Sequence, residues 1–302
     1  MGLEQWTLKP TGLVLNGGGG KGAYQIGAFR AMRDAGISDL ITAVAGTSVG
    51  ALNMCLFNYD DGTVGEDIWN HISPEQFVDP DVELIDGKEG LVKRDGLLDI
   101  IDGYLNLDKI RNNPLPLYAT VTEFDGEEDG KKEARYLKLN GRSYDEIKKI
   151  LLATSSMPFI YESVEMNGLM YKDGGLTDNL PIKPLYDLGI RQFVVILLNH
   201  QGVVEVDKFP GSSFLIIKPS RDLGDLVTGT LDFTSKGAKV RMDLGYMDAA
   251  RAIRFFGDKT APVDEITRIE LRQFENKQIV DNAMNDADEN ISKLNNLINK
   301  YM

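Results

Sequence analysis

The sequence predicts an α/β protein whose central, mostly parallel sheet has helices on both faces, a three-layer α/β/α architecture. Two strand–loop–helix units follow one another in the first 57 residues, and each has a glycine-containing loop between an apolar strand and a helix. The chain has 302 residues, of which 42% are hydrophobic and 26% charged, as in ordinary globular proteins. Successive units of this kind favour right-handed crossovers, and ligands then bind at the carboxyl ends of the strands.

The two units are read from apolar runs and helical spacing. The first has a strand at Thr11–Asn16 and a helix that begins at Ala23 and is closed by Ala35-Gly36. The second has a strand at Leu40–Ala45 and a helix at Ala51–Phe57. Both glycine loops are therefore expected at the carboxyl edge of the sheet, where active sites form.

The middle of the chain predicts more strands and two helices. A polar turn at Asp125–Lys132 lies between two strand-like runs, which favours a hairpin-like edge. Ser143 and Glu146 have the spacing of a capping box at a helix start, and we expect Pro158 to stop that helix. The expected elements are strands at Leu115–Thr122, Ala134–Leu139, Gln192–Leu198 and Ser213–Ile217, helices at Ser143–Ala153 and Ile182–Leu188, and a loop before Ile182.

The composition changes at about Asp264, where Asn, Asp, Glu and Lys become frequent. Ile291, Leu294, Ile298 and Tyr301 fall on one helical face. We therefore expect one domain, residues 1–263, and a C-terminal helical extension, residues 264–302, that packs on it.

Charge and cysteine content exclude several classes of function. Lys and Arg number 33 against 46 Asp and Glu, a formal net charge of −13 that repels nucleic acid. The single cysteine, Cys55, cannot form an intramolecular disulfide, and no Cys/His cluster has metal-ligand spacing. No metal or other cofactor is expected. Without a signal-like start or an apolar run of about 20 residues, the expected location is cytoplasmic.

The first candidate site is the run Gly17-Gly18-Gly19-Gly20-Lys21-Gly22. Consecutive glycines let backbone N–H groups converge at a helix start, which suits an anion. Gly17, Gly19 and Gly22 also fit the dinucleotide fingerprint, so a nucleotide-binding module is an alternative. The acidic residue expected after the second strand is missing, however, and Lys21 is not followed by Ser or Thr as in a P-loop.

The second candidate site is Gly46-Thr47-Ser48-Val49-Gly50, a G-x-S-x-G sequence between a strand and a helix. Such a turn exposes the serine hydroxyl at the helix N-terminus, as in a nucleophile elbow. A serine nucleophile needs a base. His200, after a strand, would give a Ser-His-Asp triad, whereas His71 is expected at the surface or at a helix end; the third candidate site, Asp173-Gly174-Gly175, offers a carboxylate base instead.

Together the three segments resemble the patatin-like phospholipase family, in the same order and at reasonable separations. The likeness extends from about Leu13 to Pro184 and is looser beyond. The family's short helix and its serine–proline loop resemble Gly96–Leu107 and Ala153–Pro158. The resemblance implies the following site residues: catalytic Ser48 and Asp173; an oxyanion hole at Gly17, Gly18, Gly19, Gly20, Lys21 and Gly22; a nucleophile elbow at Gly46, Thr47, Val49 and Gly50; and a base loop at Gly174 and Gly175.

The function implied is a serine lipid acyl hydrolase of phospholipase A or esterase type, which uses a Ser-Asp dyad without histidine or calcium and forms an acyl-enzyme. An ordinary aspartate, with a pKa near 3.9, must gain proton affinity by burial before it can serve as the base. Alternatives are the His200 triad and a non-catalytic nucleotide- or lipid-binding module. The partner expected is a lipid or acyl ester. Transient membrane-surface contact and the oligomeric state stay open.

The segment Asp95–Leu105 places apolar residues on one helical face: Leu97, Leu98, Ile101, Tyr104 and Leu105. This face suits an acyl pocket or a membrane surface, but a core-facing helix is the stronger interpretation.

Overall fold

The described part of the chain forms two compact units, residues 1–257 and 258–302. The computed structural model describes residues 9–57, 63–72, 95–125, 130–158, 161–258 and 260–301, with the backbone alone at 95–96, 288–292 and 294–301. The first unit contains every candidate site residue.

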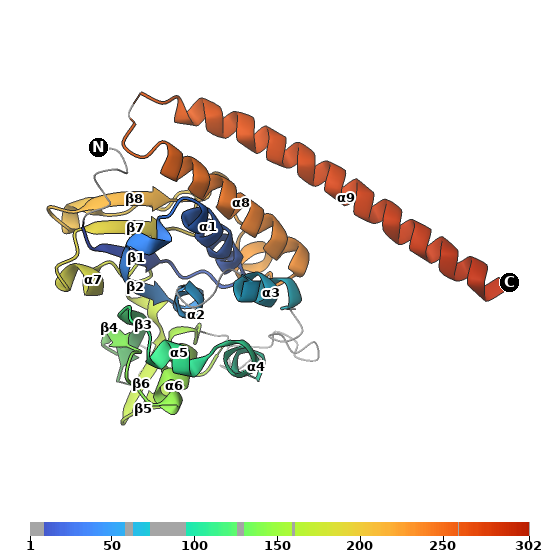
Figure 1. The fold of residues 1–302 in the computed structure, drawn as a ribbon. Coiled ribbons are helices and arrows are strands. Elements are labelled where there is room, and N and C mark those ends of the chain that lie inside the picture. The colour runs from blue at the N-terminus through green and yellow to red at the C-terminus, as the bar shows by residue number, and fades with distance from the viewer. Residues whose placement is uncertain are drawn as a thin grey trace. The chain divides into compact units, whose positions relative to one another are not determined.

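The first unit is built on a mixed sheet with strand order β5-β6-β3-β2-β1-β7-β8, and β4 also pairs with β3 (Figure 1). The five strands from β3 to β8 in this order are parallel, whereas β4, β5 and β6 pair antiparallel. Helices cover both faces, so the three-layer α/β/α prediction is confirmed. The strands are β1 Thr11–Leu15, β2 Ile41–Thr47, β3 Leu117–Phe124, β4 Lys132–Lys138, β5 Val164–Met166, β6 Leu169–Asp173, β7 Gln192–Ile196 and β8 Ser213–Ile217.

The helices follow from apolar spacing and from local capping. Ser143 caps α6 in a full capping box with Glu146, as predicted. The helices of the first unit are α1 Ala23–Asp34, α2 Val49–Phe57, α3 Thr63–His71, α4 Asp95–Tyr104, α5 Leu107–Arg111, α6 Tyr144–Thr154, α7 Lys183–Asp187 and α8 Ser235–Arg254. Short 3-10 turns at Gly19–Gly22 and Gly174–Leu176 and a π-helical turn at Leu226–Thr230 complete the site region.

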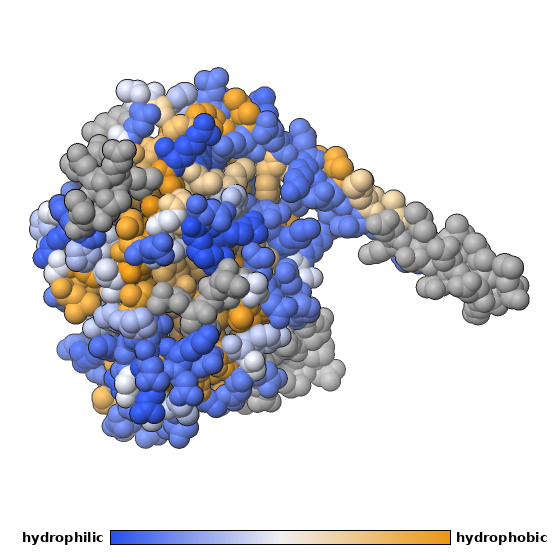
Figure 2. All heavy atoms as spheres, in the orientation of Figure 1, coloured by the Kyte–Doolittle hydropathy of each residue, from blue (hydrophilic) through white to orange (hydrophobic). Residues whose placement is uncertain are grey.

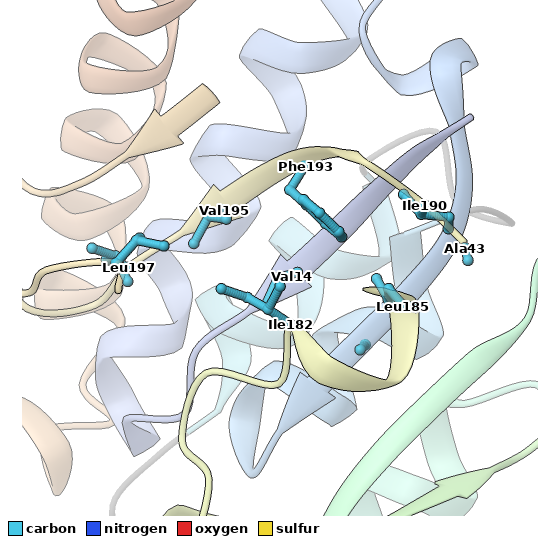
Figure 3. Close-up of a cluster of buried hydrophobic side chains, with 10 residues drawn as sticks. Val14, Ala43, Ile182, Leu185, Ile190, Phe193, Val195 and Leu197 are labelled. Carbon is cyan, nitrogen blue, oxygen red and sulfur yellow. The ribbon is translucent and has the colours of Figure 1, made fainter. Parts of the chain in front are cut away.

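One face of the sheet packs against α7 in a dense apolar cluster (Figure 3). Val14, Ala43 and Phe193 come from three adjacent strands and meet Ile182 and Leu185 beside them. Alternate residues such as Leu13 and Leu15 point to the other face and are fully buried there. The parallel strands are therefore buried on both faces, which explains their continuous apolar sequences.

Helices α1 and α8 touch through two glycines. A Cβ on Gly27 would lie 1.8 Å from the Met242 carbonyl oxygen, and one on Gly245 would lie 2.0 Å from that of Tyr24. Between the helices, the buried Tyr24 hydroxyl donates to Asp248, which also pairs with Arg251 of α8. This packing fixes α8 beside the glycine-rich loop that precedes α1.

Some sequence predictions differ from the structure. The segment predicted as a loop before Ile182 contains the β5–β6 hairpin, because β6 gains its backbone partners from the distant strand β3. The hairpin of β3 with β4 is confirmed, and β4 forms the expected edge because, among the described strands, it pairs with β3 alone. Strand β3 is interior, with β2 and β6 along its other side. Helix α6 ends at Thr154, before Pro158 can stop it, and α8 was not predicted.

The second unit consists mainly of one helix, α9 Val263–Tyr301, which confirms the helical prediction for the tail. The side chains of Ile291, Leu294, Ile298 and Tyr301 lie outside the described residues, so the proposed apolar face, the boundary at 263/264 and packing on the domain stay predictions.

In the part of the chain that the structure describes, no helix combines the length and apolarity needed to cross a membrane. Figure 2 shows polar residues over much of the visible face, with small apolar groups between them.

Candidate active site

The predicted nucleophile elbow lies where β2 passes into α2. Ser48 has a φ of 55°, a left-handed conformation that is rare for a residue with a side chain. A Cβ on Gly46 would lie 2.4 Å from the Gly50 carbonyl oxygen, and one on Gly50 would lie 2.5 Å from that of Leu15. The two glycines therefore let the turn close tightly against β1, as a G-x-S-x-G elbow requires.

A threonine relay holds this strained turn. The Ser48 amide donates to Thr154 Oγ1 over 2.9 Å, and Thr154 Oγ1 donates to the Thr120 carbonyl oxygen over 2.5 Å. Thr154 ends α6 and is fully buried. The relay ties the elbow to β3, the strand with which both β2 and β6 pair.

Strand β3 also brings Asp173 to the elbow. Antiparallel β4 pairs with β3 along one edge, so β2 and β6 share the opposite edge, where Thr47 pairs with Thr120 and Asp173 pairs with the next residue, Val121. The ends of β2 and β6 therefore meet at the same point of β3, which brings Ser48 beside Asp173 although 125 positions separate them in the sequence. Ser48 and Asp173 line the same cavity, and the Ser48 hydroxyl acts on the Asp173 carboxyl so as to lower its pKa.

The surroundings of Asp173 raise its proton affinity. Its side chain is 4% exposed, and burial raises its pKa to about 6, against the opposing effect of hydrogen bonds from the Gly175 amide and the Ser48 hydroxyl. The Gly175 amide donates to Asp173 Oδ1 over 2.7 Å. Gly174 is required beside it, because a Cβ there would lie 2.3 Å from the Thr120 carbonyl oxygen.

The glycine-rich loop divides into two parts. Gly17, Gly18 and Gly19 line a cavity of about 210 Å³ together with Ser48 and Asp173. Within the described residues, the Gly18 and Gly19 amides meet no acceptor, whereas the Lys21 amide donates to the Gly18 carbonyl over 3.2 Å. Gly18 and Gly19 are therefore the amides that remain able to bind an oxyanion.

The other part of the loop is structural. Gly20 and Gly22 are buried outside the cavity, and a Cβ on Gly22 would lie 2.3 Å from Val49 of the elbow. The Lys21 side chain lies against Gly229 and near Asp225. The pKa of the Asp225 carboxyl is lowered mainly by hydrogen bonds from Thr228, and the charge of Lys21 makes a smaller contribution. We therefore assign these three residues to the shape of the loop rather than to its cavity.

A second, apolar cavity of about 90 Å³ also reaches Ser48, Gly19 and Met157. Its wall comes from α2, α3, α4 and the segment at 231–233. A core-facing helix was the stronger interpretation of 95–105, with an acyl pocket as the alternative. Leu97 and Leu105 line the cavity, as does Ile100, whereas Leu98 and Ile101 do not and Tyr104 is exposed. The apolar lining residues are Val49, Leu52, Leu56, Ile68, Trp69, Ile72, Leu97, Ile100, Leu105, Met157, Tyr161, Leu231 and Phe233.

Neither histidine lines the two cavities that contain Ser48. His71 ends α3 beside Asp67, which confirms the expected helix-end position. His200 Nδ1 is 3.9 Å from the Asp222 carboxylate and has no hydrogen-bond partner. The geometry therefore gives Ser48 a carboxylate rather than an imidazole as its neighbour.

Several residues near the site carry no motif. Asn179 packs against the glycine loop, because a Cβ on Gly17 would lie 2.4 Å from Asn179 Oδ1. The Asn16 side chain donates to the Asn179 carbonyl over 2.8 Å. Thr154 and Arg241 act through backbone atoms of distant segments, so no local signal could have identified them.

Cys55 is buried, as expected, and burial raises the pKa of its thiol. Among the described residues, no three His, Cys, Asp or Glu side chains group as metal ligands would.

Comparisons with known proteins agree on one family. Residues 13–186 match the model of the family described as patatin-like phospholipase. Neuropathy target esterase sws of Drosophila melanogaster is 24% identical over 219 residues, 68% of this chain and 14% of that protein. Lysophospholipase NTE1 of Phaeosphaeria nodorum is 27% identical over 197 residues, 60% of this chain and 11% of that protein.

A solved structure with a similar chain is that of the type III effector protein ExoU. It is 16% identical with a TM-score of 0.46, over 82% of this chain and 53% of that chain. The present chain thus spans a small part of the curated relatives it matches, 14% and 11% of their lengths.

Proposed function

Because the chain belongs to the patatin-like phospholipase family, we propose that it is a serine lipid acyl hydrolase that uses Ser48 as the nucleophile and Asp173 as the base. The observation that carries this proposal is that Ser48 and the buried Asp173 line one cavity together with Gly17, Gly18 and Gly19. The names of the two curated relatives, an esterase and a lysophospholipase, support an ester of a fatty acid as the substrate.

The proposed reaction has two halves. Ser48 Oγ attacks the ester carbonyl while Asp173 takes its proton, and the tetrahedral oxyanion accepts hydrogen bonds from the Gly18 and Gly19 amides. Asp173 then passes the proton to the leaving alcohol, which departs and leaves an acyl-enzyme. In the second half, Asp173 takes a proton from a water molecule that attacks the acyl carbon. Collapse of this intermediate releases the fatty acid and returns the proton to Ser48.

The apolar cavity supplies a place for the acyl chain. It begins at Ser48 and is lined mostly by aliphatic and aromatic side chains, so an acyl chain there is removed from water while its carbonyl stays at the nucleophile. The polar head of the substrate would occupy the cavity of Gly17–Gly19 and Asp173. Contact with a membrane surface and a cytoplasmic location stay predictions.

Covalent labelling tests the identity of the nucleophile. A fluorophosphonate is expected to label the wild-type chain at Ser48 and to leave Ser48→Ala unlabelled, because the serine activated by Asp173 attacks phosphorus as it attacks an ester. Peptide mass spectrometry locates the label. His200→Ala is the matched control: full labelling and ester hydrolysis in that variant are expected, whereas their loss would replace the dyad with the His200 triad.

The pH dependence tests the base. Since burial raises the pKa of Asp173 to about 6, the carboxyl is protonated and inactive as a base below that pH and ionised above it. Below pH 6, we therefore expect kcat/KM for a neutral ester to fall about tenfold for each pH unit. A pH–rate profile, with folding checked by circular dichroism at each pH, measures this. A midpoint near 4, the range of an exposed aspartate, would argue against a buried base.

A further inference from the structure

Arg241 joins α8 to the glycine-rich loop and to the segment opposite it. Its guanidinium donates to the Thr228 carbonyl over 3.0 Å, to the Asp232 carbonyl over 3.0 Å and to the Gly20 carbonyl over 3.5 Å. It also forms an ion pair with the Asp232 carboxylate at 2.6 Å. The arginine is 6% exposed, so one buried side chain binds three separate backbone positions.

The segment 228–232 presses directly on the loop that carries Gly18 and Gly19. A Cβ on Gly19 would lie 2.3 Å from the Thr230 carbonyl oxygen, and one on Gly20 would lie 2.2 Å from that of Asp232. Thr230 lines the cavity of Ser48 and Asp173, and Leu231 lines the apolar cavity. A shift of this segment would therefore change the position of the loop and the walls of both cavities.

We propose that Arg241 is a positioning residue for the oxyanion hole, which holds segment 228–232 against the glycine loop so that the Gly18 and Gly19 amides converge beside Ser48. This inference rests on the proposed function. Arg241 is not among the residues that line the two cavities of Ser48. It acts through the Gly20 carbonyl on one side and through Thr228 and Asp232 on the other.

The side chain at this position must be a planar fork. Two terminal nitrogens serve four acceptors, a geometry that the single ammonium of lysine cannot reproduce. Glycine at position 237 leaves room for the ion pair of Arg241 with Asp232, because a Cβ there would lie 3.0 Å from Arg241 Nη1 and 2.3 Å from Asp232 Oδ2. Substitution by lysine is therefore expected to lose part of the effect even though the charge remains.

Steady-state kinetics of the full chain tests the proposal. Arg241→Ala is expected to lower kcat about 10- to 100-fold with KM changed by less than about threefold, because the misplaced amides weaken only transition-state binding. Arg241→Lys, which is less disruptive, is expected to lose kcat several-fold. A polar cavity of about 300 Å³ lined by Arg241 has the carboxylates of Asp222 and Asp232 in its wall beside Arg221 and Lys236. Guanidinium can therefore enter and pair with Asp232, and millimolar guanidinium chloride is expected to restore much of the kcat of Arg241→Ala.

Arg251→Ala is the matched control. Arg251 is also on α8, is 7% exposed and pairs with Asp248, but this pair faces Tyr24 rather than segment 228–232. It should lower Tm while kcat per active site, counted with a fluorophosphonate, changes by less than about threefold. Unchanged kcat in Arg241→Ala would overturn the proposal, as would equal losses in both variants without rescue by guanidinium.

A fluorescence readout separates this proposal from the proposed function. Trp69 stacks on Phe233 with ring centroids 6.3 Å apart, so its emission reports the segment that Arg241 holds. In a Trp6→Phe background, which leaves Trp69 as the sole tryptophan, Arg241→Ala is expected to shift that emission and guanidinium to reverse the shift. If the wild-type chain hydrolyses no ester, the proposed function fails. An unchanged emission of Trp69 in Arg241→Ala would then overturn the positioning role by itself.

Discussion

Replacing Asp173 with Asn is expected to lower kcat/KM for a lipid ester by about 10³- to 10⁴-fold. Asparagine keeps the size of the side chain and can accept the hydrogen bond from the Gly175 amide that now reaches Asp173 Oδ1. It cannot take the proton of Ser48, however. The loss therefore measures the base function, and ester hydrolysis under saturating and limiting substrate gives kcat and KM separately.

A double variant sharpens this test. Ser48→Ala is expected to lose at least as much activity as Asp173→Asn, and the two substitutions together no more than Ser48→Ala alone, because residues that act as one unit are not additive. Additive losses would contradict a dyad. Thermal unfolding of each variant is the control for folding, and since removing a buried carboxylate relieves desolvation, Asp173→Asn is not expected to lower Tm markedly.

The sequence indicated the candidate nucleophile more directly than the contacts that hold the site together. Ser48 could be found because an elbow is local: the glycines at 46 and 50 and the adjoining strand and helix lie within a few residues. Asp173 could be paired with it only through the family resemblance. Its position depends on β6, a short strand with little apolar pattern that pairs with β3 where β3 extends past the end of β2.

The supports of the site could not be predicted for the same reason. Thr154 binds the Ser48 amide 106 positions away, and Arg241 binds the Gly20 carbonyl 221 positions away. Both contacts use a backbone atom as one partner, so the sequence of that partner carries no signal. The oxyanion hole at Gly17–Gly22 stays a prediction that the sequence could not narrow, because glycines required for packing, such as Gly20 and Gly22, look the same in a sequence as glycines that would bind an oxyanion.

Gly19→Ala is expected to lower kcat by about 100- to 1000-fold, the cost of losing one oxyanion-hole donor. Gly19 has a φ of +55°, and a Cβ there would lie 2.3 Å from the Thr230 carbonyl oxygen and 2.9 Å from the Thr230 side chain. The backbone must therefore move away from segment 228–232 or change its φ, and either movement redirects the amides of Gly18 and Gly19. Since ground-state binding of the acyl chain uses the apolar cavity, KM should change far less than kcat.

Gly141→Ala separates this effect from backbone strain. Gly141 has a φ of +78° and open space around its would-be Cβ, so alanine there incurs the left-handed penalty of about 1–2 kcal/mol without a collision. Both variants should lose stability in thermal unfolding, but only Gly19→Ala should lose kcat per folded molecule. If Gly141→Ala loses activity equally, general strain explains the result. If Gly19→Ala keeps its activity, the amide that stabilises the oxyanion is not in this loop, and the dyad must act with another donor.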